Sequence, residues 1–185
     1  MVKKNGKRGF IDKTGEEVIS LGLYDYVWSF SEGLSRVNIG LKLVDRTIQE
    51  FGKWGFIDKT GREVIPINST YDSVSSFSEE LCWVRKDGKW GFIDKTGKEI
   101  TPLIYDDVGS FSEGLCWVKK DGKRGFIDKT GKEITPLIYD EVSDFSEGLC
   151  WVRKGDKRGF IDKTGKVVIP INSTYDSVWS FSEGL

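Results

Sequence analysis

The heptapeptide Gly-Phe-Ile-Asp-Lys-Thr-Gly occurs five times in this chain of 185 residues, and no other feature constrains the fold as strongly. The copies begin at residues 9, 55, 91, 125 and 159, so their spacings are 46, 36, 34 and 34 residues. A nearly fixed period of this size is typical of an array of small stacked units rather than of one irregular core. We therefore expect one structural unit, repeated five times.

The composition favours strands and tight turns. The chain contains no alanine, whereas it has 22 glycines and 13% aromatic residues. In the third copy, Cys82–Lys86 and Lys89–Asp94 are short β-rich runs joined by Asp87-Gly88, which suits a two-residue turn with positive φ. Trp83 is then predicted to face Phe92 across the hairpin.

The end of the heptapeptide predicts a second turn. Lys95-Thr96-Gly97 should place its glycine in the left-handed region, with Asp94 accepting hydrogen bonds from the turn amides. A third strand, Lys98–Thr101, is expected to stop at Pro102, because proline cannot donate to a strand ladder. Residues Tyr105, Val108 and Phe111 follow and are predicted to enter the core.

The recurring motif resembles that of a known repeat family. Lys53–Asp58 and Lys89–Asp94 both read Lys-Trp-Gly-Phe-Ile-Asp and precede Lys-Thr-Gly, as in the bacterial WG-repeat (KWG-repeat) proteins. Three copies depart from the motif, with arginine at the tryptophan position. The resemblance covers essentially the whole chain and implies a β-rich repeat module, with no catalytic or ligand residues to transfer.

We predict an all-β fold, a tandem array of five short antiparallel meander repeats with a period of about 34 residues, forming one repeat domain over 1–185. The repeats are expected at residues 1–34, 35–81, 82–115, 116–149 and 150–185. An open superhelical or solenoid-like array is the first expectation. A closed ring is the alternative, in which Val2–Lys4 would supply the strand missing after Leu185.

The second repeat carries an insertion. Asn38 and Trp54 have 15 residues between them, where Arg85 and Trp90 have four, so this hairpin is 11 residues longer. Ile39, Leu41 and Leu43 alternate with small or polar residues, and the tip is expected at 45–47. We interpret residues 38–53 as a projecting hairpin arm, and insertions of this kind are often on a binding face.

Nothing in the sequence indicates an enzyme, a cofactor or a metal site. Asp-Lys-Thr-Gly also begins the phosphorylated motif of P-type ATPases, but that chemistry needs a single aspartate with a magnesium site, and here the motif recurs on hairpins. Carboxylate pairs such as Asp106-Asp107 recur beside turns, which favours capping. The chain has no histidine, so the usual neutral-pH general base is absent. Cys82, Cys116 and Cys150 lack metal-ligand spacing and are predicted to be small buried residues.

Columns of tryptophan and arginine are the remaining candidate for binding. We expect one of two arrangements: these side chains pack between repeats, or they form a partly exposed stripe that binds a sugar, a peptide or single-stranded nucleic acid. The alternation of tryptophan with arginine favours partial exposure, because a buried slot would not accept a guanidinium without a partner. The candidate residues are Arg8, Trp54, Trp90, Arg124, Arg158, Arg85, Trp28 and Trp179.

The charge pattern and the termini bound the partners. The net charge of −1 gives no general attraction to nucleic acid, but each repeat is basic in its first half and acidic in its second. Either stacked repeats bring opposite halves together, or charged rims steer a partner. No apolar run could span a membrane, and the start lacks a secretion signal, so the cytoplasm is the default. The chain starts and stops within a repeat, as a fragment of something longer would.

These observations predict a non-catalytic module for protein–protein interaction or scaffolding. The partner expected is another protein, and no membrane span is expected. The alternative is a binder of carbohydrate or of another cell-surface ligand that uses the aromatic and arginine stripe.

Overall fold

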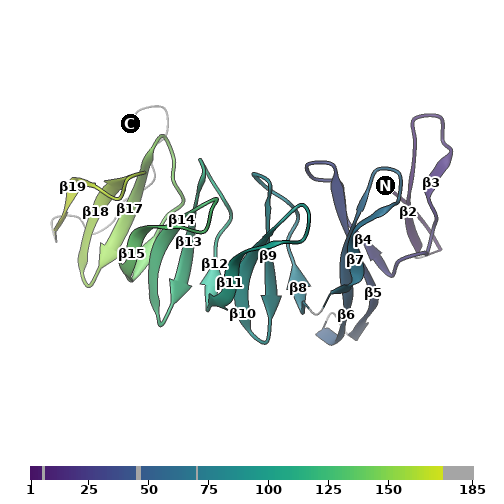
Figure 1. Cartoon of the computed structure of the whole chain (residues 1–185), viewed down its shortest axis with the longest axis horizontal. Coiled ribbons are helices and arrows are strands. Elements are labelled where there is room, and N and C mark those ends of the chain that lie inside the picture. Colours follow the sequence, from purple (N-terminus) through teal and green to yellow (C-terminus); the bar gives the residue numbers. More distant parts are fainter. Residues whose placement is uncertain (6, 45–46, 70, 173–185) are drawn as a thin grey trace. The chain divides into compact units, whose positions relative to one another are not determined.

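The computed structural model describes residues 1–5, 7–44, 47–69 and 71–172, and strands are the regular elements of this part of the chain (Figure 1). The strands form five antiparallel sheets, one for each copy of the heptapeptide, which confirms the predicted all-β repeat fold. The chain divides into two compact units, Met1–Gly88 with Phe92–Glu99 and Lys89–Gly91 with Ile100–Leu185, so the boundary passes through the third sheet.

The sheets follow the order of the chain. The first has three strands, β1 (Val2–Lys4), β2 (Lys7–Ile11) and β3 (Glu17–Ile19). The second has β4 (Tyr26–Val27), β5 (Leu34–Val44), β6 (Thr47–Asp58) and β7 (Glu63–Ser69). The third has β8 (Ser73–Val74), β9 (Leu81–Lys86), β10 (Lys89–Asp94) and β11 (Glu99–Tyr105). The fourth has β12 (Asp107–Val108), β13 (Leu115–Lys120), β14 (Lys123–Asp128) and β15 (Glu133–Tyr139). The fifth has β16 (Glu141–Val142), β17 (Leu149–Lys154), β18 (Lys157–Asp162) and β19 (Val167–Asn172).

The short first strand of each four-stranded sheet precedes a tight turn that leads into the hairpin. In the second sheet this turn is Ser31–Leu34, whose end residues exchange two backbone hydrogen bonds of 2.9 and 3.0 Å. Its central residues, Glu32 and Gly33, both have positive φ. The strand before the turn therefore pairs with the hairpin after it, and β8, which falls in the predicted repeat 35–81, belongs to the sheet of the next repeat.

The hairpin register follows the turn chemistry. In the fourth sheet Trp117 pairs with Phe126 and Val118 with Gly125, and the fifth sheet repeats this register. The turn residues Asp121 and Gly122 have φ of 51° and 78°, as a two-residue hairpin turn requires. The register predicted for the third copy is thus the one found in its counterparts.

The second turn is built by the aspartate of the heptapeptide. Asp128 Oδ1 accepts hydrogen bonds from the amide and hydroxyl of Thr130, at 2.8 and 2.6 Å, and from the amide of Lys132 at 3.1 Å. Gly131 has φ of 81°. The threonine hydroxyl is the largest of several contacts that lower the pKa of Asp128 below its ordinary value. The other four copies form the same contacts, which confirms the predicted turn.

The third strand was predicted to stop at its proline, and this is wrong. Strand β15 continues through Pro136 to Tyr139. Phe126 pairs with Thr135 and Arg124 with Tyr139, so residues 136–138 bulge out opposite Gly125. Proline fits in the bulge because no ladder hydrogen bond is needed there, and the Thr135 hydroxyl accepts the Phe126 amide at 2.9 Å.

The bulge explains the glycine at the centre of the motif. A Cβ at Gly125 would lie 2.7 Å from the carbonyl oxygen of Thr135 and 2.8 Å from that of Pro136. The equivalent atom would lie 2.4 Å from Ile19 O at Gly9 and 2.6 Å from Ile169 O at Gly159. Real Cβ atoms are not found this close to backbone, so the close crossing of strands requires glycine.

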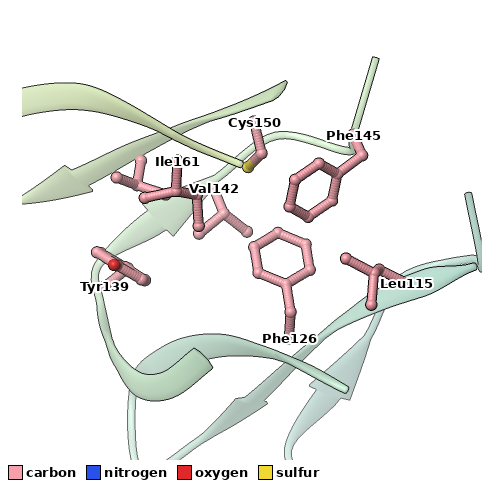
Figure 2. Close-up of a cluster of buried hydrophobic side chains, with 8 residues drawn as sticks. Leu115, Phe126, Tyr139, Val142, Phe145, Cys150 and Ile161 are labelled. Atoms are coloured by element: carbon pink, nitrogen blue, oxygen red, sulfur yellow. The ribbon is translucent and has the colours of Figure 1, made fainter. Parts of the chain in front are cut away.

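The core lies between consecutive sheets. In the second unit, Phe126 from the fourth sheet meets Cys150 and Ile161 of the fifth, with Tyr139, Val142 and Phe145 beside them (Figure 2). Val152 belongs to the same cluster. Tyr105, Val108 and Phe111 are also buried, as predicted. In the first unit, Phe10 and Ile19 of the first sheet pack with Val37 and Ile57 of the second.

We predict that Gly125→Ala destabilises the protein by about 2 kcal/mol or more, because the new methyl group must displace backbone in the bulge. Urea unfolding of the variant measures this loss. Gly122→Ala is the matched control: its Cβ would meet no atom within 4 Å, and only its positive φ opposes it, at a cost of about 1 kcal/mol. A Gly125 variant that is as stable as the Gly122 variant would contradict the close-crossing argument.

We predict that Glu80→Gly stabilises the protein by about 1 kcal/mol, since Glu80 has φ of 72° at a position where other copies carry Gly33, Gly114 and Gly148. The backbone hydrogen bond from Glu80 to Glu32 does not depend on the side chain and should persist. The reverse change, Gly114→Glu, should cost a similar amount. A lower urea midpoint for Glu80→Gly would show that the glutamate side chain itself stabilises the turn.

Candidate functional site

In the pairs Asp106-Asp107 and Asp140-Glu141, the first carboxylate binds both backbone and a lysine. Asp106 Oδ2 accepts the amide of Asp121 in the hairpin turn at 2.8 Å, and Oδ1 contacts Lys89 Nζ at 2.6 Å. Asp140 repeats this with the amide of Gly155 and with Lys123 Nζ. The lysine contact is the largest of the effects that lower the pKa of both aspartates. The predicted capping role is confirmed for these two residues.

A second set of contacts links neighbouring sheets through the Ser-Glu-Gly turn. Glu113 Oε2 accepts the Gly148 amide at 3.2 Å and contacts Lys163 Nζ at 2.7 Å. In the first unit Glu32 likewise binds the Glu80 amide, at 2.9 Å, and Lys95 Nζ, at 3.1 Å. Stacking thus brings the acidic turn of one sheet onto a lysine of the next sheet. These pairs are partly exposed, so each contributes only about 0–1 kcal/mol.

The cysteines are buried and free, as expected for small residues of the core. Cys82, Cys116 and Cys150 have exposed fractions of 0–1%. The Sγ atoms of Cys82 and Cys150 donate to the carbonyls of Ser75 and Ser143 at 3.2 Å. Burial raises the pKa of both thiols to about 12, which keeps them protonated and unreactive at neutral pH. No group of three metal-ligating side chains gathers in the described part of the chain.

The first unit brings three of the predicted binding residues into one cluster. The guanidinium carbon of Arg8 lies 5.6 Å from the ring centre of Tyr26. Tyr26 stacks on Trp28 at 5.8 Å, and Trp28 lies 5.2 Å from Trp54. Trp54 is only 6% exposed, and its indole nitrogen donates to the carbonyl of Asp72 at 3.1 Å, so it offers little surface to a ligand. Arg8, Tyr26 and Trp28 are half-buried.

Sequence reasoning missed Arg36, which completes this cluster. Its guanidinium carbon lies 4.6 Å from the Trp28 ring centre, and its Nη1 donates to the carbonyl of Val74 at 2.5 Å. Its Nε is buried without a hydrogen-bond partner, and burial lowers its pKa. The alignment of the repeats could have revealed this residue. Because Ser35 aligns with Cys82, Arg36 aligns with Trp83 in the column of tryptophans.

In the second sheet the arginine of the hairpin, Arg36, is on the first strand and the tryptophan, Trp54, is on the second. In the fourth sheet this order is reversed. Arg124 on β14 places its guanidinium carbon 4.6 Å from the ring centre of Trp117 on β13. A cation over an indole face is worth about 0.5–1 kcal/mol or more when water is excluded, which explains how a half-buried position accepts arginine. A hydrogen bond from Arg153 is the main effect that lowers the pKa of Glu141, and desolvation opposes this lowering. The positive charges of Arg124 and Arg158 lower the same pKa further.

The remaining candidates are dispersed. Arg85 of the first unit and Trp90 and Arg158 of the second are half-buried, and Trp179 lies outside the described residues. The candidate residues with described contacts form local arginine–aromatic pairs, within a sheet for Arg124 with Trp117 and between the first two sheets for Arg8 with Tyr26. The described part of the chain holds no helix of the length and apolarity needed to cross a membrane.

Comparisons with known proteins place the repeat in a family. One similar solved structure is titled crystal structure of the eukaryotic initiation factor, with 12% sequence identity and a TM-score of 0.39 over 92% of this chain. This chain spans 48% of the length of that protein. No curated protein matches. The family described as WG containing repeat matches residues 9–41, 54–90, 90–123, 125–157 and 159–185. These five matches include most of the sequence, and the chain therefore belongs to the WG-repeat family.

Proposed function

We propose that this chain is a non-catalytic module that binds another protein or serves as a scaffold, through the surface of its repeats and through the arm. The side chains that a catalytic mechanism would use form hydrogen bonds within turns or are buried in the core. Asp106 and Asp140 cap turns, the heptapeptide aspartates hold their own turns, and the cysteines are buried and protonated. The largest difference between the repeats is the arm inserted in the second.

The observation that carries the proposal is where the arm is inserted. In an ordinary repeat the two turn residues are adjacent, as Asp87 and Gly88 are, and the amide of Asp87 binds Asp72. In the second repeat Gly40 and Gly52 take these places. Both keep positive φ, of 84° and 66°, and the Gly40 amide binds Asp25 Oδ2 at 2.6 Å. The arm is thus an insertion within one turn that leaves the sheet contacts unchanged.

The sequence of the arm is rich in apolar residues. Strands β5 and β6 pair beyond the turn position, with Leu41 opposite Phe51 and Leu43 opposite Ile48. Among the described strands, β4 pairs only as far as Asn38 and β7 only from Trp54, so the arm is a two-stranded ribbon. Such a ribbon is only marginally stable alone in water, and a partner that covers it would stabilise it.

We predict that deleting residues 41–51 abolishes binding of the arm's partner and leaves the fold intact, because Gly40 and Gly52 then form an ordinary Gly-Gly hairpin turn. Quantitative mass spectrometry of proteins captured by the wild type and by the deletion variant measures the first effect. Thermal unfolding measures the second, with an expected change in free energy of unfolding below about 1 kcal/mol. Identical sets of captured proteins would remove the arm from the proposed function.

Carbohydrate binding is a second candidate, and the half-buried Trp28 favours it. This indole lies between Tyr26 and Trp54 under the guanidinium of Arg36, and flat aromatic faces beside an arginine suit the apolar and hydroxyl faces of a sugar. If this candidate is right, a glycan array gives specific binding that Trp28→Ala reduces at least tenfold, whereas Trp151→Ala in the other unit leaves it unchanged. An array without specific signals would contradict carbohydrate binding.

A further inference from the structure

Two guanidinium groups of the first unit lie against aromatic rings and not against carboxylates. Arg8 comes from β2 of the first sheet, and its guanidinium carbon lies 5.6 Å from the ring centre of Tyr26. Arg36 comes from β5 of the second sheet, and its guanidinium carbon lies 4.6 Å from the ring centre of Trp28. In the described part of the chain, neither arginine has a carboxylate within ion-pair distance.

The two rings connect the two arginines. Tyr26 begins β4 and Trp28 follows its end, so both residues are on the same side of an extended segment. Their rings stack with centres 5.8 Å apart and an interplanar angle of 27°. We call Arg8, Tyr26, Trp28 and Arg36 the arginine–aromatic stack. All four side chains are half-buried, so part of each is open to solvent.

The charge of Arg36 is poorly compensated inside the protein. Its Nη1 donates to the carbonyl of Val74 at 2.5 Å, but its Nε is buried without a hydrogen-bond partner. Burial lowers the pKa of Arg36, although an arginine remains protonated throughout the ordinary pH range. A cation that is withdrawn from water is costly unless an anion or further acceptors compensate it. An anion that reaches the stack would therefore be attracted.

The second unit has the same arginine position with a carboxylate beside it. Arg124 is equivalent to Arg8, one residue before the glycine of the heptapeptide. Glu141 begins β16 and is thus equivalent to Tyr26, which begins β4. A hydrogen bond from Arg153 is the largest effect that lowers the pKa of Glu141, and the charge of Arg124 adds to it. The next sheet therefore supplies a carboxylate to Arg124 and only a ring to Arg8.

The second arginine of the stack has no charged counterpart in the other hairpins. The residues equivalent to Arg36 are tryptophans, namely Trp83, Trp117 and Trp151. Asp25 precedes Tyr26 in the chain, but its Oδ2 accepts the amide of Gly40 at 2.6 Å. The stack thus combines two positive charges with two aromatic rings, and the carboxylate found in the second unit is replaced by one of the rings.

We propose that the arginine–aromatic stack binds an acidic carbohydrate, whose carboxylate or sulfate takes the place that Glu141 has in the second unit. This inference rests on carbohydrate binding, the second candidate function, and names the class of sugar. The planar guanidinium of Arg8 presents N–H donors in a fork that matches such an oxyanion. The charge of Arg36, on the other side of the rings, adds to the attraction.

A sugar suits this site better than an acidic peptide does. The apolar faces of a sugar ring can pack on the exposed parts of Tyr26 and Trp28 while the oxyanion contacts arginine. A carboxylate on a sugar ring is also held rigidly, whereas a glutamate side chain loses rotamer freedom when it is bound. The combination of rings with guanidinium groups therefore favours an acidic sugar over an acidic protein segment.

A glycan array with neutral, uronic-acid and sulfated oligosaccharides gives the first test. The acidic oligosaccharide that binds best is then titrated against the full chain by calorimetry, together with its carboxyl-reduced or desulfated form. The acidic form is expected to bind about tenfold more tightly or better, because a hydrogen bond to a charged group is lost in the neutral form. Its affinity should fall as the salt concentration rises. The array also distinguishes the two anions, since uronic-acid and sulfated sugars are separate arms.

Two variants locate the anion. Arg8→Gln removes one charge of the stack, and Tyr26→Glu supplies the carboxylate that the second unit has at Glu141. Each should weaken binding of the acidic form about tenfold or more, and Arg8→Gln should leave the affinity for the neutral form unchanged. Arg124→Gln is the matched control, because it removes an arginine that also lies over an indole, and it should change neither affinity. Thermal unfolding checks that the variants fold, and either stack variant suffices for the test.

The outcomes separate this inference from carbohydrate binding itself. Equal affinities for the acidic and neutral forms would overturn the inference and leave carbohydrate binding standing. An array without specific signals would overturn both. A glutamate-rich peptide that binds as tightly as the acidic sugar, and that also depends on Arg8, would overturn the inference by showing that the stack selects an acidic protein segment.

Discussion

Neither face of an interior sheet is left to water, and the rest of the structure depends on this packing. In the fourth sheet Cys116 points to one side and Phe126 to the other, yet each is only 1% exposed. A meander of three or four short strands cannot bury a core by itself, so each sheet is stable only against its neighbours. The glycine of the motif serves this packing, because the crossing of the third strand over Gly125 leaves no room for a Cβ.

The same arrangement gives many of the charged residues a structural role. The carboxylates that recur in each repeat bind amides within their own sheet, as Asp128 does, or bridge to the next sheet, as Glu113 does. Lysines from the basic half of a repeat complete the bridges. The insertion in the second repeat leaves these contacts unchanged, and it is there that the proposed module would bind a partner.

Much of this fold follows from local rules that a sequence displays. Asp-Gly turns set the hairpin register, and Asp-Lys-Thr-Gly sets the next turn, because both depend on residues close in sequence. The passage of the third strand through Pro136 could not be predicted, since it depends on a bulge between two strands, which the local sequence does not display. The assignment of β8 to the following sheet is also a tertiary fact.

The candidate site likewise has features that the sequence predicts and features that depend on tertiary packing. The tryptophan and arginine columns were visible as spacing, but not which strand of a hairpin would carry each. Arg36 was missed because its partner Trp28 comes from a different column, and Trp54 is buried because its indole finds the carbonyl of Asp72. Such pairings depend on tertiary packing, which the spacing of residues in a single sequence does not reveal.

The central claim is that stacking, and not the sheet itself, holds each repeat. Hydrogen exchange of the native chain, followed at each amide under dilute monomeric conditions, tests it most directly. The heptapeptide is identical in all five copies, so intrinsic exchange rates within it are nearly the same. The account predicts that the amides of Phe126 and Ile127, in a sheet covered on both faces, exchange at least tenfold more slowly than those of Phe10 and Ile11, in a sheet covered on one. Equal protection at the two sites would contradict it.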